Sequence, residues 1–174
     1  LETLNLEGCQ LPELPDTITQ LKALVSLNLK DNQLSPIPDS ITRLTSLKEL
    51  NFARNKLTEL PDTIGKLTAL EKLDLEANQL TNLPKTITQL TALASLSLEN
   101  NELSLIPEAI RQLTGLKELK LGKNMLTSIP DSLTRLPSLE KLDLSENQIK
   151  SLPESIGQLT TLKELNVNDN QLTT

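Results

Sequence analysis

The sequence predicts an α/β repeat protein in which each unit contributes one short strand and one short helical turn. Three observations lead to this prediction. Leucine accounts for 42 of the 174 residues, a bias that calls for a search for internal repeats. The chain aligns with itself at a period of 23 residues without insertion or deletion. The seven apolar columns of the template L-x-x-L-x-L-x-x-N-x-L-x-x-L-P-x-x-I-x-x-L-x-x hold 53 positions, and every one is Leu, Ile, Phe or Val.

The first part of each repeat predicts a strand. Positions four to six read apolar, polar, apolar, as in Leu4-Asn5-Leu6 and Leu142-Asp143-Leu144. Alternation with a period of two is typical of a short strand with one buried face.

The ninth position predicts a tight turn after this strand. An asparagine amide both donates to and accepts from backbone groups that a turn leaves unpaired. We therefore assign a structural turn role to Asn32, Asn55, Asn78, Asn101, Asn124, Asn147 and Asn170. In the first repeat the column holds Cys9, which we expect to be buried.

A proline followed by apolar residues three and six places later predicts a short 3₁₀ or α turn. Proline suits the first position of a helix, where its missing N–H loses nothing. The next residue is usually acidic, and a base often follows four residues later, which predicts i,i+4 ion pairs. Three such pairs are Asp39 with Arg43, Asp62 with Lys66, and Asp131 with Arg135.

Composition and charge exclude several classes of function. A net charge of −6 and a pI near 4.8 argue against a nucleic-acid surface built on Lys and Arg. No run of 18 apolar residues predicts a membrane span, and no basic and then apolar leader opens the chain. The single cysteine forms no internal disulfide, so a reducing compartment fits best.

The motif resembles the leucine-rich repeat family, over all 174 residues. Its L-P-x-x-I-x-x-L half is similar to that of Ras-group and LAP-type scaffolds, death-domain signalling proteins and many bacterial proteins. The resemblance implies a horseshoe-shaped solenoid with a parallel β-sheet on the concave side and short 3₁₀ or α turns on the convex side.

We expect residues 1–174 to form one domain of seven full repeats and a partial eighth. Family members usually carry capping segments, and here Leu1 already belongs to a core column. We therefore expect a fragment of a longer protein that lacks both caps and either self-associates end to end or frays at its ends. The expected location is intracellular, or inside a host cell if the protein is a bacterial effector.

Positions 3, 5, 7, 8 and 10 of each repeat are expected on the concave face or its rim, where they carry a net charge of −5. Stacked strands would bring Glu49 beside Lys72, and Glu118 beside Lys141 and then Glu164. Such ladders either keep the sheet soluble or form a polar binding strip. The candidate partner-binding residues are Glu49, Lys72, Asp74, Glu76, Glu99, Glu102, Glu118, Lys120, Lys123, Met125, Lys141 and Asp143.

Two groups within this set differ from the other repeats. Glu76 and Glu99 are neighbours at position seven with Glu102 close by, and they read either as solvated surface acids or as a site for a basic segment. Met125 stands in a rim column otherwise filled by Gln, Lys and Glu. It reads either as sequence drift or as a contact for a protein partner.

Catalysis is not predicted. Without His or Tyr, neither a Ser-His nor a Cys-His nucleophile can be assembled. The five glycines are scattered and form no phosphate loop. Carboxylates such as Asp74 and Glu76 have no predicted pocket that would raise a pKa. We expect no metal and no cofactor.

These observations predict a non-catalytic module that binds a protein partner, including a basic segment, on its concave face. The alternative is a regulatory or substrate-recruiting arm of a multidomain protein, such as a GTPase or a ubiquitin-ligase effector. A designed consensus array fits less well, because Pro12, Pro36, Phe52, Leu105 and Pro137 break the pattern irregularly.

Overall fold

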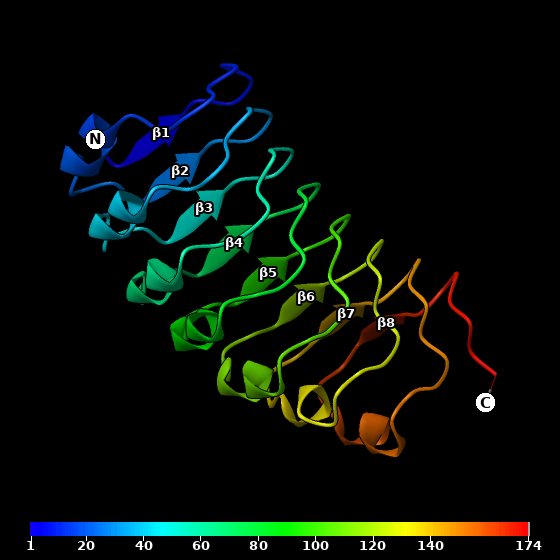
Figure 1. The fold of residues 1–174 in the computed structure, drawn as a ribbon. Helices are drawn as coiled ribbons and strands as arrows, with labels where there is room; N and C mark the ends of the chain where they lie inside the picture. The colour runs from blue at the N-terminus through cyan, green and yellow to red at the C-terminus, as the bar shows by residue number, and fades with distance from the viewer. Residues whose placement is uncertain (174) are drawn as a thin grey trace.

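Eight strands of three residues each form one parallel sheet in chain order. The structure is a computed structural model, and it describes residues 1–173. Figure 1 shows the strands side by side along one face of the molecule. They are β1 (Thr3–Asn5), β2 (Ser26–Asn28), β3 (Glu49–Asn51), β4 (Lys72–Asp74), β5 (Ser95–Ser97), β6 (Glu118–Lys120), β7 (Lys141–Asp143) and β8 (Glu164–Asn166). The predicted solenoid is therefore confirmed.

The sheet is in register with the 23-residue period. Each residue pairs with the residue 23 positions later, as Leu50 does with Leu73 and Glu49 with Lys72. Because the register never shifts, one column of the sequence becomes one straight row on the sheet. The central residue of each strand points into the core, and its two neighbours point outward.

The returning segments are 3₁₀ helices on the opposite side from the sheet. They are η1 (Asp16–Gln20), η2 (Asp39–Arg43), η3 (Asp62–Lys66), η4 (Lys85–Gln89), η5 (Glu108–Gln112), η6 (Leu133–Arg135) and η7 (Glu154–Gln158). Within the described residues, none of these turns has the length or the apolar run that crossing a bilayer needs.

In six of the seven turns proline is the N-cap, one residue earlier than predicted, whereas in η6 the N-cap is Ser132. Pro15 is the N-cap of η1 and has an extended backbone, with φ −67° and ψ 135°. Its carbonyl accepts the first bond of the turn, from the N–H of Ile18 at 3.0 Å. Buried Thr19 adds a second restraint by donating its hydroxyl to the carbonyl of Asp16 at 2.7 Å.

The core is a stack of leucines that is closed in the middle of the chain and open at its ends. Leu73, at the centre of β4, is 2% exposed, whereas Leu165 in the same column is 39% exposed. Leu1 and Leu172 are also exposed. End-to-end association through these leucines stays a prediction, which light scattering of the isolated chain tests.

After each strand the chain turns through the left-handed region. Position eight has a positive φ in every repeat, a feature that the sequence analysis did not predict. The residues are Gly8, Asp31, Arg54, Ala77, Asn100, Lys123, Glu146 and Asp169. This turn places positions nine and ten beyond the end of the strand.

Candidate functional site

The outward face of the sheet holds most of the predicted partner-binding residues. Glu49, Lys72, Asp74, Glu118, Lys120, Lys141 and Asp143 lie on β3, β4, β6 and β7. Glu76 and Glu99 follow β4 and β5, while Glu102, Lys123 and Met125 lie in or just beyond the turns. All twelve side chains are partly or fully exposed. We call this surface, made by positions 3, 5, 7, 8 and 10, the concave face.

The concave face is hollowed in its middle. A depression of about 400 Å³ lies over β2 to β5. Its outward side chains are Ser26, Asn28, Glu49, Asn51, Lys72, Asp74, Glu76, Ser95, Ser97 and Lys120. A second depression follows over β6 to β8 and includes Glu118, Lys141 and Asp143. Both are lined by hydroxyl, amide and charged groups, so the surface is suited to polar recognition.

The register confirms all three predicted neighbours in the charge ladders, and two of these neighbours form ion pairs. Glu49 and Lys72 lie 2.8 Å apart, and Lys141 and Glu164 lie 3.0 Å apart. The hydrogen bond from Lys72 lowers the pKa of Glu49, and the bond and charge of Glu164 raise the pKa of Lys141.

The register places Glu118 beside Lys141 as predicted, but the two side chains form no ion pair within residues 1–173. Glu118 accepts a hydrogen bond from Ser95 at 3.1 Å and lies 3.6 Å from Lys120 on its own strand. These two neighbours occupy its carboxylate, while Lys141 has turned to Glu164 in the next repeat.

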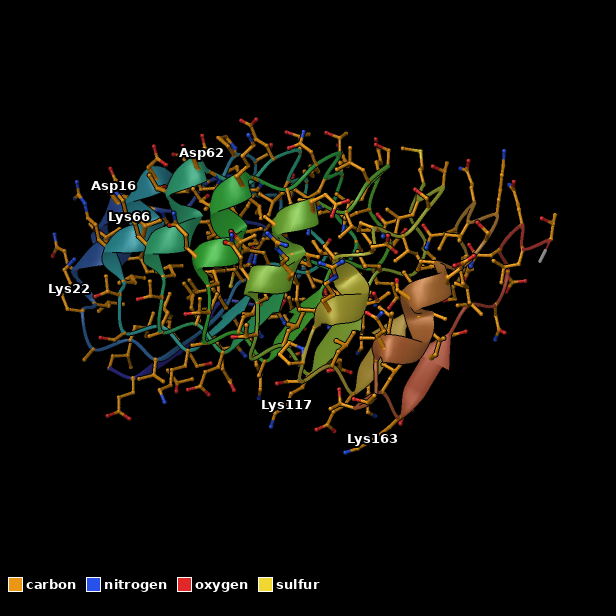
Figure 2. All side chains as sticks on the ribbon, turned by 90° about the horizontal axis from the view of Figure 1, so that it is seen from below. Asp16, Lys22, Asp62, Lys66, Lys117 and Lys163 are labelled. Atoms are coloured by element: carbon orange, nitrogen blue, oxygen red, sulfur yellow. The ribbon has the colours of Figure 1, made fainter. Side chains whose placement is uncertain are left out.

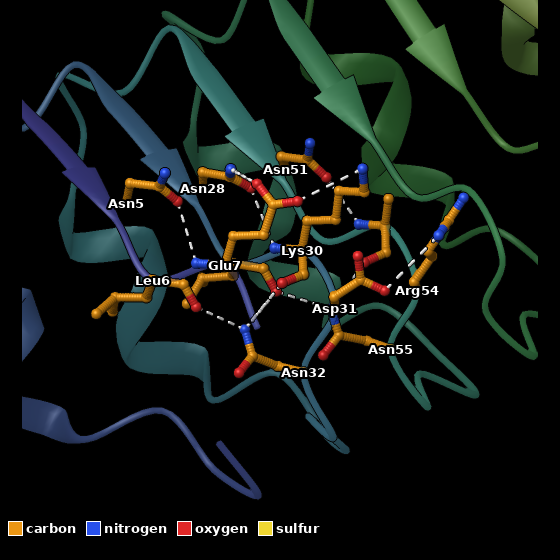
Figure 3. A network of polar contacts seen from close by, with 12 residues as sticks. Asn5, Leu6, Glu7, Asn28, Lys30, Asp31, Asn32, Asn51, Arg54 and Asn55 are labelled. Carbon is orange, nitrogen blue, oxygen red and sulfur yellow. Dashed lines mark hydrogen bonds and ion pairs between the residues drawn. The ribbon is translucent and has the colours of Figure 1, made fainter. Parts of the chain in front are cut away.

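In six of the eight repeats the side chain at position five accepts a backbone hydrogen bond within its own repeat, a bond that was not predicted. The Oδ1 atom of Asp74 accepts the backbone N–H of Glu76 at 3.0 Å, and Asp143 accepts that of Ser145 at 2.9 Å. Asparagines at the same position do likewise in the repeats of β1, β2, β3 and β8. Figure 3 shows this bond for two of them, Asn5 and Asn28. The signal was present, because six of eight repeats have Asn or Asp there.

All bases on the concave face except Lys56, which bonds to Gln33, are paired with carboxylates, whereas several acids are not paired. Within 4.0 Å of a carboxylate lie the terminal groups of Lys30, Arg54, Lys72, Lys120, Lys123 and Lys141. Within residues 1–173, no hydrogen bond or ion pair reaches the carboxylate of Glu76, Glu99 or Glu102. These three glutamates follow β4 and β5, and together they are called the acidic group below.

Two apolar side chains are exposed near this part of the chain. Met125 is 42% exposed, and its backbone N–H donates to the carbonyl of Leu103 in the preceding repeat. Leu105, which breaks the repeat pattern, is 57% exposed.

The asparagine column is structural, as predicted. The Oδ1 atom of Asn78 accepts the N–H of Leu57 at 3.0 Å, and its Nδ2 donates to the carbonyls of Phe52 and Leu75. The same set of bonds repeats at Asn32, Asn55, Asn101, Asn124, Asn147 and Asn170. Each asparagine therefore ties its own turn to the repeat before it.

The expectation for Cys9 is wrong, because this cysteine is exposed. Six asparagines of the same column, from Asn32 to Asn147, are buried and bond to the repeat before them, whereas no described residues precede the repeat of Cys9. The sulfur lies 3.7 Å from the carbonyl oxygen of Glu7.

The i,i+4 ion pairs predicted on the convex side are also wrong within residues 1–173. Asp39 accepts the hydroxyl of Thr63 at 2.6 Å, and Asp131 accepts that of Ser155 at 2.7 Å. A 3₁₀ helix has about three residues per turn, so side chains four apart no longer face each other. Figure 2 shows convex Asp16, Asp62 and Lys66 on the helical turns, away from Lys117 and Lys163 near the strands.

No cluster of three metal-ligating side chains occurs within residues 1–173.

Comparison with known families gives one consistent result. Residues 50–128 match the profile of a leucine-rich repeat region, and residues 1–57 and 114–172 match that of a leucine rich repeat. A search of the curated proteins finds no match.

Solved structures of leucine-rich repeat proteins superpose over nearly the whole chain. A leucine-rich repeat protein of Leptospira interrogans is 39% identical, with a TM-score of 0.85. The superposition covers 98% of this chain and 49% of the Leptospira chain. An internalin of Listeria monocytogenes is 31% identical, with a TM-score of 0.81. The superposition covers 93% of this chain and 46% of the internalin chain.

The ectodomain of the plant membrane receptor kinase GASSHO1/SCHENGEN3 from Arabidopsis thaliana is also similar. It is 32% identical, with a TM-score of 0.83, and the superposition covers 91% of this chain and 20% of the ectodomain chain. That ectodomain was solved in complex with CASPARIAN STRIP INTEGRITY FACTOR 2. The chain thus spans about half of the two bacterial proteins and a fifth of the plant ectodomain.

Proposed function

The chain belongs to the leucine-rich repeat family, and we propose that it is a non-catalytic module whose concave face binds a protein partner. Proteins of this family are typically protein-interaction modules. The similar plant ectodomain, crystallised with a partner, supports the same kind of role here.

The observation that carries the proposal is the acidic group. Every base on the strands of this face already has a carboxylate partner, but Glu76, Glu99 and Glu102 have none. Like charges on neighbouring repeats cost stability unless something offsets them. A basic segment of a partner offsets them, and it also gains long-range attraction during its approach.

The test compares charge reversal on the two sides of the molecule. Peptides are first selected from a random display library against the chain. Changing Glu76, Glu99 and Glu102 to Lys is expected to slow association and to flatten its salt dependence, because salt screens long-range attraction.

The matched control reverses three acids outside the concave face, Glu59, Glu108 and Glu154. Within residues 1–173 none of them makes a side-chain hydrogen bond or an ion pair. Lys85 already begins η4, so lysine is tolerated at the position of Glu108 and Glu154. If this control loses binding and the concave variant keeps it, the assigned face is wrong.

A second candidate is that the chain is the recognition arm of a longer signalling protein or effector. The coverage favours it, because the chain spans only part of each similar protein named above. In that case the concave face still binds the partner, and the activity resides in another domain. The full reading frame decides between the two.

A further inference from the structure

One carboxamide on the concave face is held at both of its ends. The Oδ1 atom of Asn28 accepts the backbone N–H of Lys30 at 3.1 Å, and its Nδ2 donates to Oε2 of Glu7 at 3.0 Å (Figure 3). The amide therefore sits between the N–H at position seven of its own repeat and the glutamate at position seven of the preceding repeat. We call this pair of partners an amide seat.

The same pair of partners occurs twice more along the sheet. After β5, the N–H of Glu99 stands one repeat beyond the carboxylate of Glu76. After β6, the N–H of Gly122 stands one repeat beyond the carboxylate of Glu99. Strand spacing puts the two seats about 4.8 Å apart.

Neither seat holds an amide of the chain; Glu99 is partly exposed, and Gly122 is buried. Within residues 1–173, no acceptor is hydrogen-bonded to the N–H of Glu99 or of Gly122. Position five, which supplies the amide in the second repeat, is here Ser97 or Lys120. Lysine has no acceptor, and the ammonium of Lys120 lies 3.6 Å from Glu118 at the other end of β6.

The chemistry of the seat selects its occupant. A carboxylate would accept from the N–H, but the glutamate of the seat would repel it. An ammonium or guanidinium group would pair with the glutamate, but it has no lone pair for the N–H. A primary carboxamide satisfies both groups, as Asn28 does.

We propose that the two open seats bind Asn or Gln side chains of an extended segment in a protein partner. This proposal rests on the proposed function of the concave face and names the chemistry recognised there. Alternate residues of an extended segment point to the same side. Two of them are about 7 Å apart, and flexible Gln side chains converge from that spacing. A Lys or Arg next to them would reach Glu102.

The first experiment fills the seats from within the chain. The double variant Ser97→Asn/Lys120→Asn places an amide at position five of both repeats, and Ser97→Ala/Lys120→Ala is the matched control. Hydrogen exchange of the N–H of Glu99 and Gly122 is expected to slow at least tenfold in the Asn variant alone. Unchanged exchange in a folded Asn variant would refute the geometry of the seats.

The second experiment offers a defined probe. The peptide Thr-Gln-Thr-Gln-Thr carries acetyl and N-methylamide caps, so its only primary amides are the two Gln side chains. Two comparison peptides have Glu or Met in place of both Gln residues. We expect the Gln peptide alone to move the amide resonances of Glu99 and Gly122, in the wild type and the Ala variant but not in the Asn variant.

Three results would overturn the proposal: equal shifts with the Glu or Met peptide, equal shifts in the Asn variant, or no shift with the Gln peptide. These results are separate from those of the charge-reversal test. If selected peptides bind the convex side while the Gln peptide moves these two resonances, the proposed function fails and the seats stand. If selected peptides bind the concave face and the Gln peptide moves nothing, the seats fail alone.

Discussion

The middle repeats and the ends of this solenoid have the same sequence pattern in different surroundings. Leu73 and Leu165 occupy one column, yet the first is buried and the second is partly exposed. Asn78 is buried, whereas Asn170 makes the corresponding bonds while half-exposed. The motif specifies the conformation of each unit, but its burial depends on a neighbour on each side.

This difference shows where the stability of the chain resides. Burial of a leucine requires the adjacent repeats, so a column contributes most in the middle of the stack. Surface ion pairs need only one adjacent repeat, and they form both at Glu49 with Lys72 and at Lys141 with Glu164. Comparing one column at two places therefore separates the contribution of the neighbours from that of the motif.

The largest effect is expected from the leucine column. Leu73→Ala removes a side chain that is 2% exposed and leaves a cavity, at a cost of about 2–5 kcal/mol. Leu165→Ala, in the last strand, should cost much less because solvent already reaches that side chain. Urea unfolding of the two variants measures this, and equal losses would show that the end repeat is as well packed as the middle.

The asparagine column should give the next largest effect. Asn78→Ala leaves the N–H of Leu57 unpaired and removes one of the two donors to each of the carbonyls of Phe52 and Leu75, at a cost of about 1–3 kcal/mol. Gln79→Ala, at the exposed neighbouring position, is the control and should change little.

Asn170→Ala provides the comparison at the end of the chain. Its side chain is half-exposed, so water can replace part of its bonding and the loss should be smaller. If Asn78→Ala and Gln79→Ala unfold at the same urea concentration, the turn asparagine does not hold the repeats together.

The sequence predicted the features that each repeat specifies by itself. The apolar columns correctly predicted the strand and the core. The donor and acceptor groups of the asparagine side chain correctly predicted that it bonds to the backbone of the turn. Features that depend on a neighbour were harder to predict. Cys9 is exposed because no described repeat lies before it. Glu118 has two bases and a serine as neighbours, and it contacts Ser95 and Lys120 but not Lys141.

The candidate site was predicted in its position but not in its bonding. Asp74 was correctly expected on the concave face, but its bond to the N–H of Glu76 was missed. An Asn or Asp in this column reads equally well as a solvent-facing polar residue, so the pattern alone does not reveal the bond. The open seats after β5 and β6 can be recognised only once the bond from position five to the N–H at position seven is known in the other repeats.

A glycine pair gives a smaller and more local comparison. Gly65 and Gly157 share position 19, but a Cβ on Gly65 would lie 2.6 Å from the carbonyl oxygen of Thr86 and would also contact Oε1 of Gln89. A Cβ on Gly157 would meet nothing within 4 Å. Gly65→Ala is expected to cost about 1–3 kcal/mol through overpacking against η4.

Gly157→Ala should be neutral or slightly stabilising, because alanine restricts the unfolded chain more than glycine does. Thermal unfolding of the two variants provides the measurement. A comparable loss at both positions would mean that the close approach of η3 and η4 is not what constrains Gly65.

The smallest effect is expected from the surface ion pair of Glu49 and Lys72. The hydrogen bond from Lys72 lowers the pKa of Glu49 below its ordinary value of 4.5. A carboxyl whose pKa is lower in the folded state adds stability above its unfolded pKa and loses it as the pH falls through the folded pKa. The contribution should therefore be complete at neutral pH, decline as the pH falls below the unfolded pKa, and be lost below the folded pKa. Lys72→Met is expected to raise the pKa of Glu49 in an NMR titration, with little change in stability because the pair is solvent-exposed. A pKa that stays low in Lys72→Met would show that Ser26, the other hydrogen-bond donor to Glu49, sets it instead.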